Sequence, residues 1–468
     1  VRSSRLVVPP STGLGAAAAD TALAAAVTEG LIGRLAELLP PEIGVIARTS
    51  AMRFRAAASV ADVREALGVD YVLEGSVARA GGEIRVHARF IHAGDQAHLW
   101  AETHEAPIDE LPRVQHVIAE RIATSVSGQL RTGATPAAGK SVPPAAWESY
   151  LQARYLLSAR LDPSSEEIAT AVELLEEVVA GAPDFALAWS ALADAVPRLA
   201  GPAPEINARS RRAAERALAL DPGLARPRHR LASLALYQEW DWGEAERQFD
   251  WALSLAPNLA LNHHSRAAWF ATQGRHEEAL ESIDRALRLD PLSVVLHADA
   301  GWYLFVARRY EEAILRCREA LELVPEHRGA NSYLLHSQLA LGRVEEAAET
   351  ARRLLVIEGA PDDLVARATG SSEAAVEALR RHRLVVLEAD YAQGRASPGR
   401  LDVARLDLGD EDTALALLEE GLESRWGWIY PFLAVYPLLD PLADEPRFQR
   451  LVDAVGIPID RAEATATS

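Results

Sequence analysis

Prolines that can end helices recur at nearly constant spacing through the middle of this 468-residue chain. They are Pro183, Pro222, Pro257, Pro291 and Pro325, so the successive gaps are 39, 35, 34 and 34 residues. A period of roughly 34 residues is typical of a pair of helices that buries its apolar side only against neighbouring pairs. The spacing therefore predicts an α-solenoid, because one compact domain is also unusual for a chain of this length.

Small and apolar residues keep a constant phase within the second helix of each unit. Small residues are needed there because helix axes pack about 8–10 Å apart, and a bulky side chain at the contact would separate them. The pattern predicts tetratricopeptide repeats over 147–360 and degenerate helical repeats with a C-terminal cap over 361–468, roughly six to eight helical pairs in all. The residues in phase are Ala245, Phe249 and Ala252; Ala279, Ile283 and Ala286; Ala313, Cys317 and Ala320; Ala347, Ala351 and Leu354.

The first part of the chain begins with helical signals. A long apolar stripe predicts a helix that is capped by Asp20 and stopped by Pro40. Ser59 followed by Asp62 resembles a capping box, and Gly68 stands where a left-handed cap would end that second helix. The stripe of the first helix consists of Leu23, Val27, Leu31, Leu35 and Leu38.

A period of two residues then replaces the helical period. It predicts strands over 71–79 and 84–90 that Gly81 and Gly82 join into a hairpin, followed by a third strand over 97–103 and a closing helix over 112–130. Polar residues on the outward face of the second strand are a candidate binding patch, although a solvated sheet face is the simpler interpretation. These residues are Arg85, His87 and Arg89.

Together these signals predict a small α/β sheet domain followed by an α-solenoid of tetratricopeptide repeats. We expect the sheet domain over 1–130 and a linker, rich in Gly, Ala and Pro, over 131–146. The repeats and the C-terminal cap follow.

Composition excludes several classes of function. A net charge of −19 makes attraction to nucleic acid or anionic lipid unfavourable. A single cysteine, Cys317, cannot form an intramolecular disulfide or a thiolate metal cluster. No window of the sequence approaches the roughly 18 consecutive apolar residues of a membrane span. We therefore expect no cofactor, no metal, no nucleic-acid partner and no membrane span in this chain.

A ladder of histidines and the absence of catalytic motifs favour a protein that is not an enzyme. His229, His263 and His297 recur 34 residues apart. Equivalent positions of successive repeats are separated by packed helices, which is too far for one metal ion, so we interpret them as packing residues. No pattern typical of a zinc protease, a serine hydrolase or a dinucleotide site appears.

Four segments of the first part carry a resemblance to a known family. Thr28–Ile32, Val45–Ser50, Leu67–Val77 and His98–Glu102 resemble the TolB-like amino-terminal domain that many bacterial proteins join to tetratricopeptide repeats. The end of the chain, over 441–458, resembles the closing segment of the same proteins. The resemblance implies membrane-linked transcription regulators and adenylate cyclases as relatives.

The predicted function is protein–protein interaction without catalysis. If the repeats stack as in their relatives, aromatic and basic residues of the first helices face a concave groove that accepts a neutral or basic peptide or protein segment. An equally good interpretation is that Trp302 and Phe305 simply fill the core between repeats. The candidate groove residues are Arg230, Tyr237, His264, Trp302, Phe305 and His336.

Two alternatives remain at this point. The chain can be the sensory half of a one-component transcription regulator or nucleotide cyclase whose output domain is absent from it, as the resemblance implies. An enzyme with a site between the sheet domain and the repeats is less favoured, because no motif supports it. We expect a cytoplasmic protein if the chain is complete, and otherwise the extracytoplasmic half of a membrane-anchored regulator.

Overall fold

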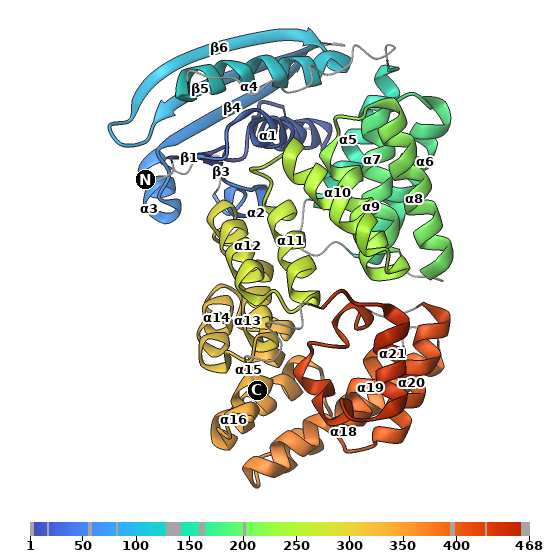
Figure 1. Ribbon diagram of the computed structural model, residues 1–468. Helices are drawn as coiled ribbons and strands as arrows, with labels where there is room; N and C mark the ends of the chain where they lie inside the picture. Colours follow the sequence, from blue (N-terminus) through green and yellow to red (C-terminus); the bar gives the residue numbers. More distant parts are fainter. Residues whose placement is uncertain are drawn as a thin grey trace. The chain divides into compact units, whose positions relative to one another are not determined.

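The computed structural model describes residues 4–15, 18–54, 59–80, 83–127, 142–158, 164–199, 203–393, 398–425 and 428–459. Within these residues a mixed sheet comes first, and a long series of paired helices follows (Figure 1). The chain divides into two compact units. The first comprises residues 1–232, 247–263 and 288–292, and the second comprises residues 233–246, 264–287 and 293–468.

The sheet combines parallel and antiparallel strands in the order β3-β1-β4-β5-β6. Parallel pairs join β1 to β3 and to β4, and antiparallel pairs join β4 to β5 and β5 to β6. The short β2 also pairs with β4. The strands are β1 (Ser4–Val7), β2 (Thr12–Gly13), β3 (Ile43–Val45), β4 (Tyr71–Ala80), β5 (Glu83–His92) and β6 (Ala97–Pro107).

Two long helices cover one face of this sheet, α1 (Ala18–Leu38) and α4 (Leu111–Ser127). Alternate residues of β4 and β5, such as Leu73 and Phe90, are fully buried under them, so the polar residues between point to the other face. The expected outward positions of Arg85, His87 and Arg89 are confirmed. The hairpin is confirmed by its register, although the expected turn at 81–82 lies outside the described residues.

The expected helix ends are largely confirmed. All five residues of the apolar stripe in α1 are buried, and the helix ends before Pro40. Ser59 and Asp62 form a capping box at the start of α3 (Val60–Leu67), and Gly68 is its left-handed cap with φ 60°. The expectation for Asp20 is wrong in detail, because the helix begins at Ala18 and Asp20 lies in its first turn.

The helices that follow form pairs, and each expected proline stands two residues after the end of a second helix. The first unit holds α5 (Pro144–Ser158), α6 (Ser165–Gly181), α7 (Ala186–Ala195) and α8 (Ala203–Leu220). Four helices have residues in both units, namely α9 (Ala225–Leu234), α10 (Trp242–Leu255), α11 (Ala260–Thr272) and α12 (His276–Leu289). The second unit continues with α13 (Val294–Val306), α14 (Tyr310–Leu323), α15 (Arg328–Ala340), α16 (Val344–Ile357), α17 (Asp362–Arg367), α18 (Ser372–Ala392), α19 (Pro398–Leu406), α20 (Glu411–Ser424) and α21 (Pro446–Val455).

In the first unit the sheet and the first helical pairs share one core. Apolar residues from Leu6 to Leu231 form one continuous cluster. The rings of Trp147 and Phe185 lie 4.7 Å apart within it. Residues 131–141 of the expected linker lie outside the described residues, and α5 begins at Pro144.

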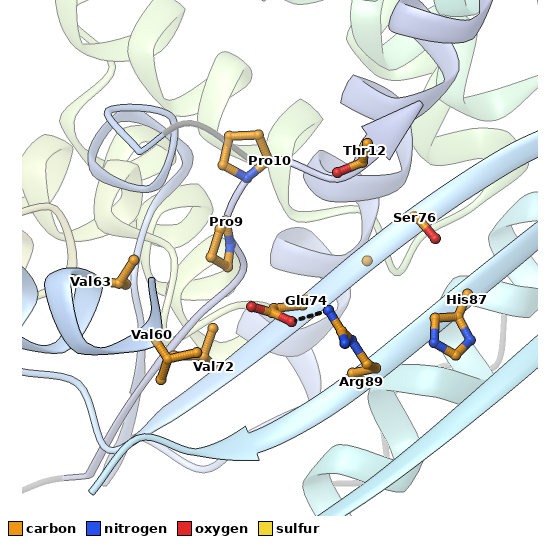
Figure 2. A pocket seen from close by; sticks show the side chains of 11 residues that line it. Pro9, Pro10, Thr12, Val60, Val63, Val72, Glu74, Ser76, His87 and Arg89 are labelled. Atoms are coloured by element: carbon orange, nitrogen blue, oxygen red, sulfur yellow. Dashed lines mark hydrogen bonds and ion pairs between the residues drawn. The ribbon is translucent and has the colours of Figure 1, made fainter. Parts of the chain in front are cut away.

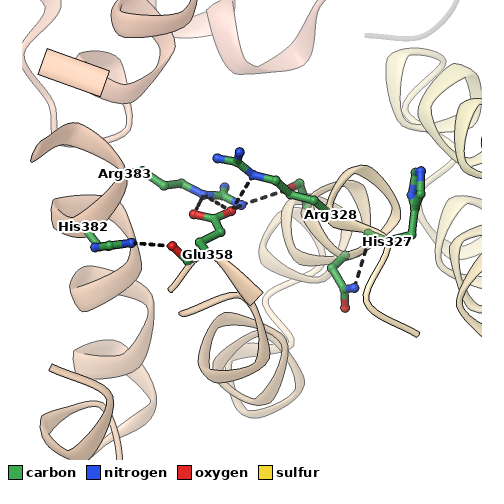
Figure 3. Close-up of polar contacts among 7 residues, drawn as sticks. His327, Arg328, Glu358, His382 and Arg383 are labelled. Carbon is green, nitrogen blue, oxygen red and sulfur yellow. Dashed lines mark hydrogen bonds and ion pairs between the residues drawn. The ribbon is translucent and has the colours of Figure 1, made fainter. Parts of the chain in front are cut away.

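In the second unit a buried carboxylate joins three helical segments. Glu358, just after α16, is 5% exposed and accepts hydrogen bonds from Arg328 of α15 and Arg383 of α18 at 3.0 and 2.8 Å (Figure 3). Arg383 also donates to the Ser332 hydroxyl at 2.8 Å. Burial alone would raise the pKa of Glu358, but hydrogen bonds and charge from the two arginines hold that pKa below its usual value.

Removing this carboxylate should destabilise the fold. We expect Glu358→Ala to lower the free energy of unfolding by about 3–5 kcal/mol, because it leaves the mostly buried Arg383 without its counter-charge. Denaturant unfolding measures the change. As a control, Glu377→Ala breaks an exposed pair with Arg381 and should cost less than about 1 kcal/mol. Equal losses in the two variants would contradict the structural role of Glu358.

Candidate functional site

The face of the first helices in the second unit holds five of the six predicted groove residues. Tyr237 lies in a short π-helical stretch, Ala235–Glu239, a type of irregularity frequent at functional sites. His264, Trp302, Phe305 and His336 lie on α11, α13 and α15. Arg230 belongs to the first unit, where its Nε lies 3.6 Å from an Asp194 carboxylate oxygen.

The aromatic part of this face is covered by the chain itself. We call residues 428–442 the C-terminal segment; it includes the short helices η4 (Tyr430–Phe432) and η5 (Pro437–Leu442). The Trp302 ring meets the Phe432 ring edge-on at 4.7 Å, and the Phe305 ring lies 6.1 Å from the Tyr436 ring. Trp302 is 7% exposed and Phe305 1% exposed. Both side chains therefore act as core in this state.

Polar contacts fix the C-terminal segment along the same helices. Arg308, after α13, donates two hydrogen bonds to the Asp440 carboxylate at 2.7 and 3.0 Å. The Tyr430 hydroxyl donates to the Leu418 carbonyl at 2.9 Å, and its ring lies 5.5 Å from the Trp240 ring. Both bonds to Asp440 come from one guanidinium nitrogen, and each is charge-assisted. The segment is thus a specific part of the fold.

A second part of the face remains accessible and centres on Asp299 of α13. The His264 Nε2 lies 2.7 Å from an Asp299 carboxylate oxygen, and the two side chains are 25% and 26% exposed. Burial raises the pKa of the Tyr237, Tyr303 and Tyr333 hydroxyls, and the charge of Asp299 raises it further. The cluster therefore presents one carboxylate among phenols that keep their protons at neutral pH.

The chemistry of this cluster suits recognition of a positive charge. The Asp299 carboxylate is a hydrogen-bond acceptor with access to solvent. Burial lowers the pKa of His336 to about 4, so that ring is neutral at pH 7 and adds no competing charge. Among the described residues, no group of three or more histidine, cysteine or acidic side chains is arranged to hold a metal ion.

Sequence reasoning missed Asp299. The signal was present, because Asp299 is the one acidic residue in α13, whose other residues are mostly apolar. The histidine ladder does not form a common site. His263 Nε2 lies 2.8 Å from the Pro257 carbonyl in the first unit, and His297 Nδ1 lies 3.4 Å from Glu319 in the second.

Comparisons with known proteins connect the helical region to one kind of repeat. Small glutamine-rich tetratricopeptide repeat-containing protein 2 of Mycosarcoma maydis is 30% identical over 87 residues, which is 19% of this chain and 25% of that protein. The TPR repeat-containing thioredoxin TTL4 of Arabidopsis thaliana is 34% identical over 87 residues, 19% of this chain and 12% of that protein. These matches support tetratricopeptide repeats in the helical region.

Another relative is of a different kind. Putative adenylate cyclase 3 of Rhizobium meliloti (strain 1021) is 33% identical over 108 residues, 23% of this chain and 18% of that protein. The chain thus spans a quarter or less of the length of each of these relatives. No protein-family model matches it, and the TolB-like resemblance of residues 1–130 stays a prediction.

Solved structures show weaker likeness. PilW, described as a widely conserved type IV pilus biogenesis factor, reaches a TM-score of 0.40 at 15% identity, covering 47% of this chain and 96% of its own. YrrB, described as a TPR protein with an unusual peptide-binding site, reaches 0.31 at 18% identity, covering 42% and 96%. These scores are too low to support an argument about function.

The covered aromatic face leads to a stability prediction. We expect Trp302→Ala to lower the free energy of unfolding by about 3–5 kcal/mol, because it leaves a cavity between α13 and the C-terminal segment. Chemical denaturation measures the loss. Val295 on the same helix is 49% exposed, so Val295→Ala should stay within about 0.5 kcal/mol. If Trp302→Ala leaves the free energy of unfolding unchanged, the C-terminal segment does not pack on this residue.

A buried acid near the C-terminal segment predicts a pH dependence. Asp402 of α19 is fully buried, and burial raises its pKa to about 7. Between about pH 4 and 7 the unfolded chain therefore ionises Asp402 while the folded chain keeps the proton, so the free energy of unfolding falls as pH rises. Asp402→Asn should remove this slope and stabilise the protein at pH 8. An unchanged slope in thermal unfolding from pH 4 to 8 would contradict the assignment.

Proposed function

We propose that this chain is a non-enzymatic interaction protein whose tetratricopeptide repeats hold a segment of a partner protein. The observation that carries the proposal is the accessible Asp299–His264 pair on the first-helix face, flanked by tyrosines. Relatives named for the same repeats support it. A net charge of −19 favours neutral or basic partners over acidic ones.

The proposed binding face is narrower than the sequence pattern predicts. Trp302 and Phe305 can serve as anchors only if the C-terminal segment leaves them, because both are buried beneath it. His264 and Asp299 form the part that a partner reaches without rearrangement, and Tyr237 and Tyr333 of α15 lie close to Asp299. An arginine or lysine of the partner would donate to Asp299, and aromatic rings would cover its aliphatic stem.

Removing the Asp299 charge tests this function. A library of short random peptides is selected on the intact protein, and the affinities of the selected peptides are then measured on variants. We expect the peptides to be rich in arginine or lysine and to bind Asp299→Asn at least about tenfold more weakly, because charge-assisted hydrogen bonds contribute about 1.5–3 kcal/mol.

The matched control removes a charge of the same sign elsewhere in the second unit. Asp284 of α12 pairs with Arg316 at 3.0 Å, and Asp284→Asn should leave peptide affinity unchanged. Selection of peptides without basic residues, or equal affinity for the Asp299 variant and the parent, would contradict the proposed face.

A second function is supported by one comparison. The likeness to a putative adenylate cyclase favours the chain as the regulatory part of a longer signalling protein, with a TolB-like domain at 1–130. Sequence upstream of the coding region provides the test. An in-frame cyclase or winged-helix region with an apolar span of about 20 residues would support it, and a stop codon directly upstream would contradict it. Among the described helices, none combines the length and apolar character needed to cross a bilayer.

A further inference from the structure

A cavity of about 110 Å³ opens on the outward face of the sheet, where β4 and β5 meet the loop after β1 (Figure 2). It has room for several water molecules. All its lining residues belong to the first unit, whereas Asp299 belongs to the second. Part of the outward polar patch, His87 and Arg89, forms its floor.

The cavity exists because the parallel pairing along β4 is interrupted between β1 and β2. Val7 of β1 pairs with Val72, and Thr12 of β2 pairs with Ser76, but the chain between them bulges away from β4. Pro9 and Pro10 occupy the bulge and carry no N–H group that could continue the ladder.

Buried hydrogen bonds hold the bulge in place. The Ser11 backbone N–H donates to the Thr28 hydroxyl of α1 at 2.8 Å, and both residues are buried. A Cβ atom on Gly75 would lie 2.8 Å from the Ser11 hydroxyl oxygen, so the glycine allows this close approach. The cavity is therefore built into the fold and does not depend on an exposed loop.

Both signs of charge line the floor of the cavity. An Arg89 nitrogen lies 2.6 Å from a Glu74 carboxylate oxygen across the two strands, with 47% and 28% of these side chains exposed. His87 uses its Nδ1 for Thr103 at 3.0 Å. Across the described residues, the Thr12 and Ser76 hydroxyls have no hydrogen-bond partner. The opposite wall is apolar, formed by Pro9, Pro10, Val60 and Val63.

This combination selects one class of ligand. A simple anion near Arg89 would be repelled by Glu74, and a simple cation near Glu74 would be repelled by Arg89. A purely apolar molecule would desolvate the Arg89–Glu74 ion pair and give it no new hydrogen bonds in return. A zwitterion satisfies both, because its ammonium group pairs with the carboxylate and its carboxylate pairs with the guanidinium.

We propose that this cavity binds a small aliphatic α-amino acid. Arg89, with the Ser76 and Thr12 hydroxyls, takes the ligand carboxylate, and Glu74 takes the ammonium group. The aliphatic side chain packs against the prolines and against Val60 and Val63. The sheet domain would then be a receptor for a metabolite, which is a role beyond the partner binding proposed for the repeats.

Calorimetric titration of the whole chain with L-valine tests the proposal. We expect saturable binding below about 10 mM, and at least tenfold weaker binding of valinamide and of isovalerate, which lack the carboxylate charge and the ammonium group respectively. Inorganic phosphate should not bind here. No saturable heat with valine, alanine or leucine would overturn the proposal, as would equal affinity for isovalerate.

Variants assign the binding to this cavity. Arg89→Gln and Glu74→Gln should each weaken valine at least tenfold. Arg85→Gln is the matched control, because Arg85 pairs with Glu105 at 2.6 Å on the same face but does not line the cavity. Val60→Phe should block the cavity without altering either charge, and circular dichroism checks that the variants fold. Unchanged affinity in folded Val60→Phe and Arg89→Gln proteins would overturn the site.

Discussion

The close approach of paired helices is the constraint on which the helical region depends. At the contact between α13 and α14, a Cβ atom on Gly301 would lie 2.6 Å from the Cys317 sulfur, so only a glycine fits there. Alanines on the second helices play the same part at the other contacts and are almost completely buried. Helices packed this closely bury their apolar sides against each other but leave the outer side of every terminal pair uncovered.

The two units cover the outer apolar side of their helical pairs in different ways. In the first, the core of the sheet continues into α5 to α8, so the earliest repeats share apolar residues with the domain before them. In the second, the C-terminal segment places Phe432 and Tyr436 against Trp302 and Phe305. The aromatic part of this face is thereby used for stability, and the Asp299 region is the part that we propose for recognition.

Local sequence signals predicted local structure well. The proline spacing located the end of each second helix, and the Ser59, Asp62 and Gly68 pattern located both ends of α3, because capping depends on residues three to five positions apart. The sequence could not show that Trp302 meets Phe432, since these residues are far apart in the chain and their contact depends on how intervening helices stack. Asp299 was missed for the same reason, because its partner His264 lies on the first helix of the preceding pair.

The polar residues of β5 were assigned to the right face of the sheet. The cavity beside them could not be predicted, because the bulge that forms it depends on the pairing of β1 and β2 with β4.

The titration behaviour of the candidate groups favours binding over catalysis. Burial raises the pKa of Cys317 to about 12, so this cysteine is a neutral thiol inside the repeat core and no nucleophile at neutral pH. The tyrosines beside Asp299 are neutral hydrogen-bond donors at neutral pH, and burial raises their pKa values further above the ordinary range. A histidine paired with a carboxylate orients a base in hydrolases, but that arrangement acts through an adjacent hydroxyl or thiol nucleophile. Around Asp299 the described residues supply tyrosine hydroxyls in place of such a nucleophile. A carboxylate beside neutral phenols attracts a positively charged group.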